Sequence, residues 1–338
     1  MSAPRLIAGL ITLLLPLALT DCGRAVTAPA LAQSARSAPE GSYAVGVRTF
    51  TLGRGTARPL SVTVWYPADG EPVLPAAAAS TAAPGRAPTC PAPTGGASTV
   101  GVAPAPQPKR DAAMAPGRFP VVLYSHGLYS LPELHAPLTS RWAAAGFVVA
   151  APTYPHTNRR TKHFSRADIA NQPGDAWRVI QYLLRLNAVP GDAFAGHLDA
   201  THVGAAGHSA GGYTTAGLFS AGHSERLRAG IIIAGAGMKG AFAGPPATML
   251  FVHGSADQTV PRSRARAAYD QLNWPKAFLT LARQGHGEYL SPGRAGFEQV
   301  LRTTTDFLRW QLYGDTAAHE RIPDDARCPG LTELVTQL

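Results

Sequence analysis

The chain has 338 residues, of which 45% are hydrophobic and 15% are charged. This length allows one large domain or two small ones with a sizeable core, which excludes a disulfide-stapled miniprotein and a wholly disordered chain. Thirty Lys and Arg residues against 21 Asp and Glu residues give a net charge of +9. The basic residues are dispersed, whereas nucleic-acid-binding proteins gather them on one face, so we expect no nucleic-acid partner. Apart from one N-terminal run, no apolar stretch reaches the about 18 to 20 residues of a membrane span, which excludes a polytopic membrane protein.

The first 32 residues have the three parts of a secretory signal peptide. Arg5 supplies the positive end, residues 6–19 are almost entirely apolar, and Ala30-Leu31-Ala32 is typical of a cleavage site. We therefore expect residues 1–32 to be removed during export. Residues 33–338 are then expected to form a single secreted domain with no stable membrane insertion.

The three cysteines fit an exported protein. Cys22 either leaves with the signal peptide or bears the lipid of a cell-envelope lipoprotein, although the residue before such a cysteine is normally small and here is Asp21. In an oxidising compartment, the remaining Cys90 and Cys328 most simply form one disulfide, and two unpaired surface thiols are the alternative. Neither has the spacing of metal ligands, so no metal site is predicted.

Two antiparallel strands are expected at the start of the domain. Apolar residues alternate with polar ones within residues 43–66, on either side of a turn at Gly53-Arg54-Gly55. In the following segment, residues 75–117, 28 of the 43 residues are Ala, Pro or Gly. Such a segment buries too little apolar surface to offset its ordering entropy, so we predict a mobile, low-complexity insertion loop that carries Cys90.

Six short apolar strands, most of them separated by helices, follow this insertion. The strands are predicted at residues 119–124, 147–151, 201–206, 230–234, 248–253 and 277–281, and the helices near 137–145, 167–187, 212–221, 263–272 and 297–312. Strands that are apolar on both faces and alternate with helices are typical of a parallel sheet covered by helices on both sides. The sequence therefore predicts an α/β domain with a mostly parallel central sheet and antiparallel N-terminal strands.

A G-x-S-x-G pattern is centred on Ser209. The pattern alone is frequent in a Gly-rich chain, but here it follows a predicted strand and opens a helix of small residues. This context is typical of the sharp turn that exposes a nucleophilic serine above a parallel sheet, where the helix N-terminus also stabilises negative charge. We predict that Ser209 is a nucleophile, and a structural serine in a Gly-rich turn is the alternative.

An activated serine needs a base, and the base needs an orienting carboxylate. The chain order in this kind of domain is serine, acid, histidine. Asp257 follows the fifth of the six predicted strands, and His286, between two glycines, follows the sixth. Ser209, Asp257 and His286 are therefore the predicted catalytic residues.

The stretch after the first of these six strands is Ser125-His126-Gly127-Leu128-Tyr129. In acyl-transfer enzymes of this type, the loop at this place supplies half of the oxyanion hole, and the residue after the nucleophile supplies the other half. We predict that the N–H groups of Leu128 and Ala210 form it, and an ordinary strand–helix turn is the alternative. The residues predicted to line the substrate-binding surface are Gly127, Tyr129, Tyr154 and His208.

Five stretches of the sequence together resemble the α/β-hydrolase family. They are FPVVLYSHG, AAAGFVVAAPTYPHTN, GHSAGG, HGSADQTVP and GHGEY, and they fall within residues 119–312. They are similar to a secreted branch that contains platelet-activating-factor acetylhydrolase-like, dienelactone-hydrolase-like and cutinase-like polyester hydrolases. The resemblance implies a nucleophile at Ser209, a base at His286, an acid at Asp257 and an oxyanion hole at Leu128 and Ala210. The C-terminal FLRWQLYGDT and CPG are also similar to actinobacterial polyester hydrolases, but residues 234–238 lack the Trp that those enzymes carry there.

The predicted function is that of a secreted serine esterase that works through an acyl-enzyme and needs no metal or organic cofactor. Its partner is expected to be a small-molecule or polymeric ester, and the chain is expected to be a monomer. A polyester, lactone or phospholipid hydrolase with the same triad remains open. So does a non-catalytic binding protein of the same fold, although such a protein would be expected to lack one of the three catalytic residues.

Overall fold

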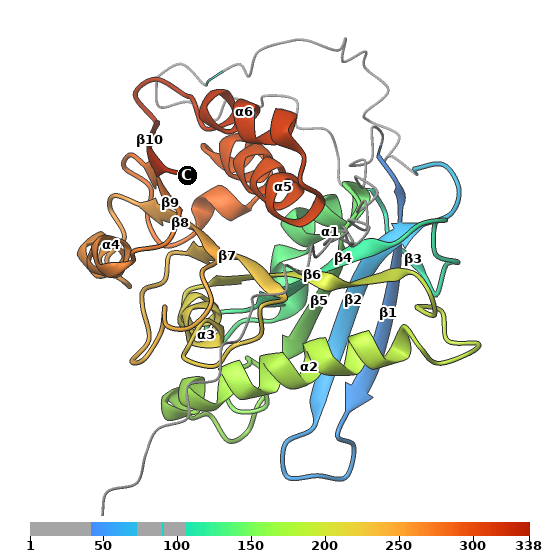
Figure 1. Ribbon diagram of the computed structural model, residues 1–338. Coiled ribbons are helices and arrows are strands. Elements are labelled where there is room, and N and C mark those ends of the chain that lie inside the picture. The colour runs from blue at the N-terminus through green and yellow to red at the C-terminus, as the bar shows by residue number, and fades with distance from the viewer. Residues whose placement is uncertain (1–41, 73–89, 91–105) are drawn as a thin grey trace, which may run out of the picture. The chain divides into compact units, whose positions relative to one another are not determined.

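The computed structural model describes residues 42–72, 90 and 106–338 (Figure 1). These residues all fall within one compact unit, residues 35–338. The predicted signal peptide, Cys22 and most of the predicted insertion lie outside the described residues. Within the described part of the chain, no helix is both long enough and apolar enough to span a membrane.

A ten-stranded sheet forms the centre of the domain, in the order β10-β9-β8-β7-β6-β4-β5-β2-β1-β3 (Figure 1). The strands from β5 through β4 to β9 are parallel, whereas β1, β2 and β10 join them by antiparallel pairing. The strands are β1 (Ala44–Leu52), β2 (Leu60–Ala68), β3 (Lys109–Arg110), β4 (Phe119–Ser125), β5 (Val148–Thr153), β6 (Leu198–His208), β7 (Leu227–Ile233), β8 (Thr248–Gly254), β9 (Lys276–Leu281) and β10 (Thr332–Gln337).

Helices cover both faces of this sheet (Figure 1). The α-helices are α1 (Ala136–Ala144), α2 (Gln172–Leu186), α3 (Ala210–Leu218), α4 (Arg262–Gln271), α5 (Phe297–Tyr313) and α6 (Thr316–Asp325). Apolar residues of α2, α3 and α4 belong to one core cluster, and those of α1, α5 and α6 belong to a second cluster. The central strands are buried on both sides because their apolar side chains face both clusters. The predicted α/β architecture with the α/β-hydrolase arrangement of layers is confirmed.

The chain continues after the helix that was expected to be the last one. Helix α6 and strand β10 both follow α5, and β10 pairs with β9 at one edge of the sheet. Both elements give weak sequence signals, since α6 contains Pro323 and the outer strand β10 is only partly buried, with no alternation of apolar and polar residues.

The end of the predicted insertion belongs to the sheet. Lys109 and Arg110 form β3 beside β1, Met114 forms a bridge with Ala68, and Ala115 is buried in the core. Residues 106–117 therefore do not behave as the mobile loop expected over 75–117. The Ala, Pro and Gly content of this stretch gave no indication that Met114 and Ala115 reach the core at the sheet's edge.

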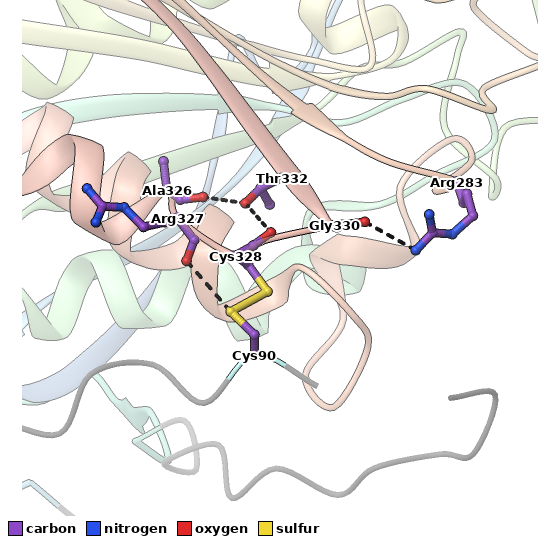
Figure 2. The surroundings of a disulfide bond; sticks show 7 residues. All are labelled: Cys90, Arg283, Ala326, Arg327, Cys328, Gly330 and Thr332. Atoms are coloured by element: carbon purple, nitrogen blue, oxygen red, sulfur yellow. Dashed lines mark hydrogen bonds between the residues drawn. A yellow bond between two sulfur atoms is a disulfide. The ribbon is translucent and has the colours of Figure 1, made fainter. Parts of the chain in front are cut away.

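A disulfide bond joins Cys90 to Cys328, whose Cα atoms are 5.5 Å apart (Figure 2). Cys328 is fully buried in the turn between α6 and β10. Thr332 Oγ1 donates to the Cys328 carbonyl oxygen at 3.2 Å, and Arg283 Nη2 donates to the Gly330 carbonyl oxygen at 3.2 Å. The turn that carries Cys328 is therefore tied to the loop after β9, which also carries His286.

Candidate active site

Ser209 stands in a strained turn between β6 and α3. Its φ is 57° and its ψ is −119°, a region that residues other than glycine avoid and that costs about 1–3 kcal/mol. The Ser209 N–H donates to the Ile233 carbonyl oxygen of β7 at 2.9 Å, and the Ser209 carbonyl oxygen accepts from the Gly212 N–H at 2.8 Å. These bonds hold the backbone in this conformation and project the side chain above the end of the sheet.

Glycines make this turn possible. A Cβ atom on Gly207 would overlap the carbonyl group of Gly211, and one on Gly211 would overlap the carbonyl group of Ser125. The turn therefore packs so closely against itself and against the end of β4 that only hydrogen fits at these positions. Both glycines belong to the G-x-S-x-G pattern, which explains why this pattern and this turn occur together.

Ser209, His286 and Asp257 form one chain of hydrogen bonds. His286 Nε2 lies 2.8 Å from Ser209 Oγ, and His286 Nδ1 lies 2.8 Å from Asp257 Oδ2. The three residues follow β6, β9 and β8, and these parallel strands place their carboxyl ends on the same edge of the sheet. The structure thus brings together the three residues that the sequence singled out.

Asp257 is oriented by its own loop. Its Oδ1 atom accepts hydrogen bonds from the N–H groups of Thr259 and Val260, each at 2.9 Å, and the residue is only 6% exposed. His253, fully buried beneath this loop, donates its Nε2–H to the Val260 carbonyl oxygen at 2.8 Å, and burial lowers the pKa of His253. The second carboxylate oxygen, Oδ2, lies 2.8 Å from His286 Nδ1 and 3.3 Å from His253 Nε2.

His126 fixes the loop after β4. Its Nδ1–H donates to the Gly127 carbonyl oxygen at 2.7 Å, and its Nε2 accepts from the Tyr154 N–H at 3.1 Å. Burial lowers the pKa of His126 to about 4, so the ring is neutral at pH 7. Because the peptide group is planar and trans, holding the Gly127 carbonyl also sets the direction of the Leu128 N–H.

Gly127 brings this loop close to the serine. A Cβ atom at Gly127 would lie 3.1 Å from Ser209 Cβ, tighter than nine in ten such contacts. Across from it, the Ala210 N–H lies in the first turn of α3, where helix N–H groups have no intrahelical acceptor. The backbone N–H groups of Leu128 and Ala210 thus belong to two segments that flank Ser209.

Tyr129 and Phe164 form an aromatic pair next to this loop. Their rings are stacked, with centroids 4.0 Å apart and an angle of 11° between the planes, and Tyr129 is 59% exposed. Tyr129 has a φ of 52°, held by a hydrogen bond from its N–H to the Thr157 carbonyl oxygen at 2.8 Å. Phe164 also lines a surface hollow of about 560 Å³ together with His156 and other residues of the same loop. Phe164 gives no signal in the sequence, because only the fold of this loop brings it to Tyr129.

The assignment of Tyr154 to the substrate-binding surface does not fit its position. Tyr154 is 0% exposed, and its hydroxyl group is 2.8 Å from Ser125 Oγ. It directly follows β5 and belongs to a core cluster rather than to the surface. His208, by contrast, is only partly buried and lies against the His286 loop.

Comparison with known families adds independent support. Residues 30–188 match the family model for platelet-activating factor acetylhydrolase, isoform II. The match covers just under half of the chain, including the Gly127–Leu128 loop, and ends before Ser209. Comparison with curated proteins returned no match. The resemblance to acetylhydrolases of the α/β-hydrolase type is thus confirmed, and together with the fold it supports a hydrolase that acts on esters.

Among the described residues, no group of three or more His, Cys, Asp or Glu side chains is arranged to hold a metal ion. The polar groups around Ser209 are instead engaged with one another, as the bonds of His286, Asp257 and His126 show. The arrangement places a serine hydroxyl group within hydrogen-bond distance of an imidazole that a buried carboxylate orients.

Proposed function

We propose that this protein is a serine hydrolase that cleaves carboxylic esters through an acyl-enzyme intermediate. The observation that carries the proposal is the position of His286, with one ring nitrogen 2.8 Å from Ser209 Oγ and the other 2.8 Å from Asp257 Oδ2. A histidine placed in this way can take the serine proton as the serine attacks a carbonyl carbon.

The roles of the three side chains follow from their hydrogen bonds. A carboxylate only accepts, so Asp257 requires the proton of the neutral imidazole on Nδ1 and leaves the lone pair of Nε2 toward Ser209. His286 takes the Oγ proton during attack and returns it to the leaving alcohol. A water molecule then repeats the sequence on the acyl group and releases the acid.

The N–H groups of Leu128 and Ala210 are the proposed donors to the oxyanion that forms on the attacked carbonyl. Removal of one such donor typically raises the barrier by about 3–4 kcal/mol. His126 supports this role, because its bond to the Gly127 carbonyl oxygen fixes the peptide whose N–H belongs to Leu128. Gly127 and the exposed ring of Tyr129 are the proposed contacts to the substrate.

A phospholipid-type ester is the substrate class that the family match favours, since the matched family is named for the hydrolysis of an acetyl group from platelet-activating factor. Small soluble esters, lactones and polyesters are the other classes that the same groups can attack. We also propose that the protein is exported after cleavage behind Ala32. N-terminal sequencing of the exported protein is then expected to begin at Gln33, and a start at Cys22 would indicate a lipoprotein.

A covalent probe tests the nucleophile without assuming a substrate. A fluorophosphonate reagent reacts with a serine that an adjacent base activates. Peptide mapping is expected to find the label on Ser209 and to find no label after His286→Ala. Labelling at another serine, or equal labelling of the variant, would contradict the proposal.

A further inference from the structure

His208 links the strand of the nucleophile to the loop of the base. It is the last residue of β6, directly before Ser209. Its Nε2–H donates to the backbone carbonyl oxygen of His286 at 2.5 Å, and the centroids of the two rings lie 4.9 Å apart. A side chain that was expected to face the substrate therefore makes its hydrogen bond to the backbone of the proposed base.

The direction of this hydrogen bond is fixed. A carbonyl oxygen only accepts, so Nε2 must carry the proton of the His208 ring. Nδ1 is then unprotonated, and it is buried with no hydrogen-bond partner among the described residues. The ring is thus held as a neutral donor toward His286, in a single tautomer.

The His208 ring also keeps the same protonation state across the pH range in which a histidine base works. The pKa of His208 is lowered to about 3, chiefly by burial and next by the His135 ring 5.0 Å away. The hydrogen bond to the His286 carbonyl oxygen raises this pKa, the His286 ring lowers it, and the charge of Asp257 raises it. The His208 ring is therefore neutral at pH 7.

The loop of His286 is shaped to receive this contact. Gly287 has a φ of 151°, and a Cβ atom there would lie 2.8 Å from His208 Nε2. On its other side, the same loop is tied to the acid loop by the bond from the Ala256 N–H to the Gln284 carbonyl oxygen at 2.9 Å. The base is thus anchored between the strand of the nucleophile and the loop of the acid.

We infer that His208 is a positioning residue, whose hydrogen bond to the His286 carbonyl oxygen holds the imidazole of His286 between Ser209 and Asp257. The inference rests on the proposed function for the role of His286. In this role, His208 acts through the base and does not contact the substrate. Two variants of similar size test the role, because only one of them keeps a hydrogen-bond donor. Gln at position 208 retains an N–H₂ donor near the place of Nε2, whereas Met has a side chain of similar length without a donor.

The experiment compares the wild type, His208→Gln and His208→Met in the full chain. A lost neutral hydrogen bond of this kind corresponds to about a tenfold effect. His208→Met is expected to lower kcat on a short p-nitrophenyl ester about tenfold with little change in KM, and to move the acidic limb of the pH profile of kcat/KM. His208→Gln is expected to recover most of kcat and the wild-type profile.

A spectroscopic reading separates this inference from the proposed function. The Nδ1 proton of His286 is expected as a far-downfield proton resonance in the wild type and in His208→Gln, and as a weakened or shifted one in His208→Met. This holds whether or not an ester is turned over. A wild type that gives the resonance without hydrolysing any ester would contradict the proposed function. The resonance would still report whether His208 positions His286.

Two outcomes would overturn the inference. If both variants change KM and leave kcat and the resonance as in the wild type, His208 contacts the substrate. If His208→Met lowers only the melting temperature, with kcat, pH profile and resonance unchanged below that temperature, the hydrogen bond is structural and does not position the base.

Discussion

His126 donates its Nδ1–H to the Gly127 carbonyl oxygen at 2.7 Å, so a fully buried histidine sets the orientation of the peptide that ends in the Leu128 N–H. This relationship connects a side chain that never reaches solvent with the proposed oxyanion hole. It explains why a histidine rather than an apolar residue occupies this buried position.

We expect His126→Phe to lower kcat about 10- to 100-fold with a smaller effect on KM, because a misdirected Leu128 N–H weakens transition-state binding. Steady-state kinetics on a short p-nitrophenyl ester measure both values. His197→Phe is the matched control, since His197 also lies within hydrogen-bond distance of a glycine carbonyl oxygen, that of Gly117 at 3.2 Å. Equal losses in the two variants would contradict a specific role for His126.

The stability of the fold is expected to fall in mild acid. Burial lowers the pKa values of His126 and His135 to about 4, well below the value of about 6.5 expected for the unfolded chain. Between these values the unfolded chain binds more protons than the folded one, so the free energy of unfolding rises with pH and is lost as pH falls from 6.5 toward 4. Each histidine contributes up to about 1.4 kcal/mol per pH unit in that window.

Melting temperatures measured from pH 7.5 to 4.5 check this expectation. His126→Gln removes one of the titrating groups, so its melting temperature is expected to change less steeply between pH 6.5 and 4.5 than that of the wild type. A variant slope as steep as the wild-type slope would show that other titrating groups, not this histidine, dominate the acid response.

The Cys90–Cys328 disulfide closes a loop with a sequence separation of 238 residues. In the chain-entropy model, a crosslink over so long a loop stabilises the folded state by about 5 kcal/mol. Cys328→Ser is therefore expected to lower the urea midpoint strongly, and addition of a reductant is expected to reproduce the effect in the wild type. Non-reducing peptide mapping of the wild type should recover the crosslinked pair, and two alkylatable thiols would refute it.

The stacked rings of Tyr129 and Phe164 are expected to act together on the substrate. Truncation of either ring to Ala is expected to raise KM for esters with an aromatic or long acyl group more than KM for an acetate ester. Because the rings are in contact, the double variant should lose less than the sum of the single variants, by about 0.5–1.5 kcal/mol. Strictly additive losses would show that the two rings act independently.

The sequence predicted that Ser209, Asp257 and His286 lie together, because the signals that single them out are local. Ser209, Asp257 and His286 each follow an apolar strand, and parallel strands end on the same edge of the sheet, so chain order alone brings the three together. The positions of strands β4 to β9 were predicted for a related reason, since burial on both faces leaves a clear local apolar pattern in these strands.

The parts that sequence analysis missed depend on contacts between distant segments. Tyr154 was assigned to the surface because the burial of a residue in a loop is not visible in its neighbours. Phe164 was missed because its stacking on Tyr129 arises only when the loop after β5 folds back. His208 was placed toward the substrate because nothing in the sequence shows that the His286 carbonyl lies beside it.

The most direct test of the proposed function is the initial rate of p-nitrophenyl ester hydrolysis, from acetate to a long acyl chain, for the wild type beside Ser209→Ala. We expect the wild type to turn over at least one ester and the variant to be slower by at least about 10³-fold. The chain-length profile would then separate a small-ester enzyme from one that acts on lipid-like esters. A Ser209→Ala variant that hydrolyses the same esters at the wild-type rate would contradict the proposed function.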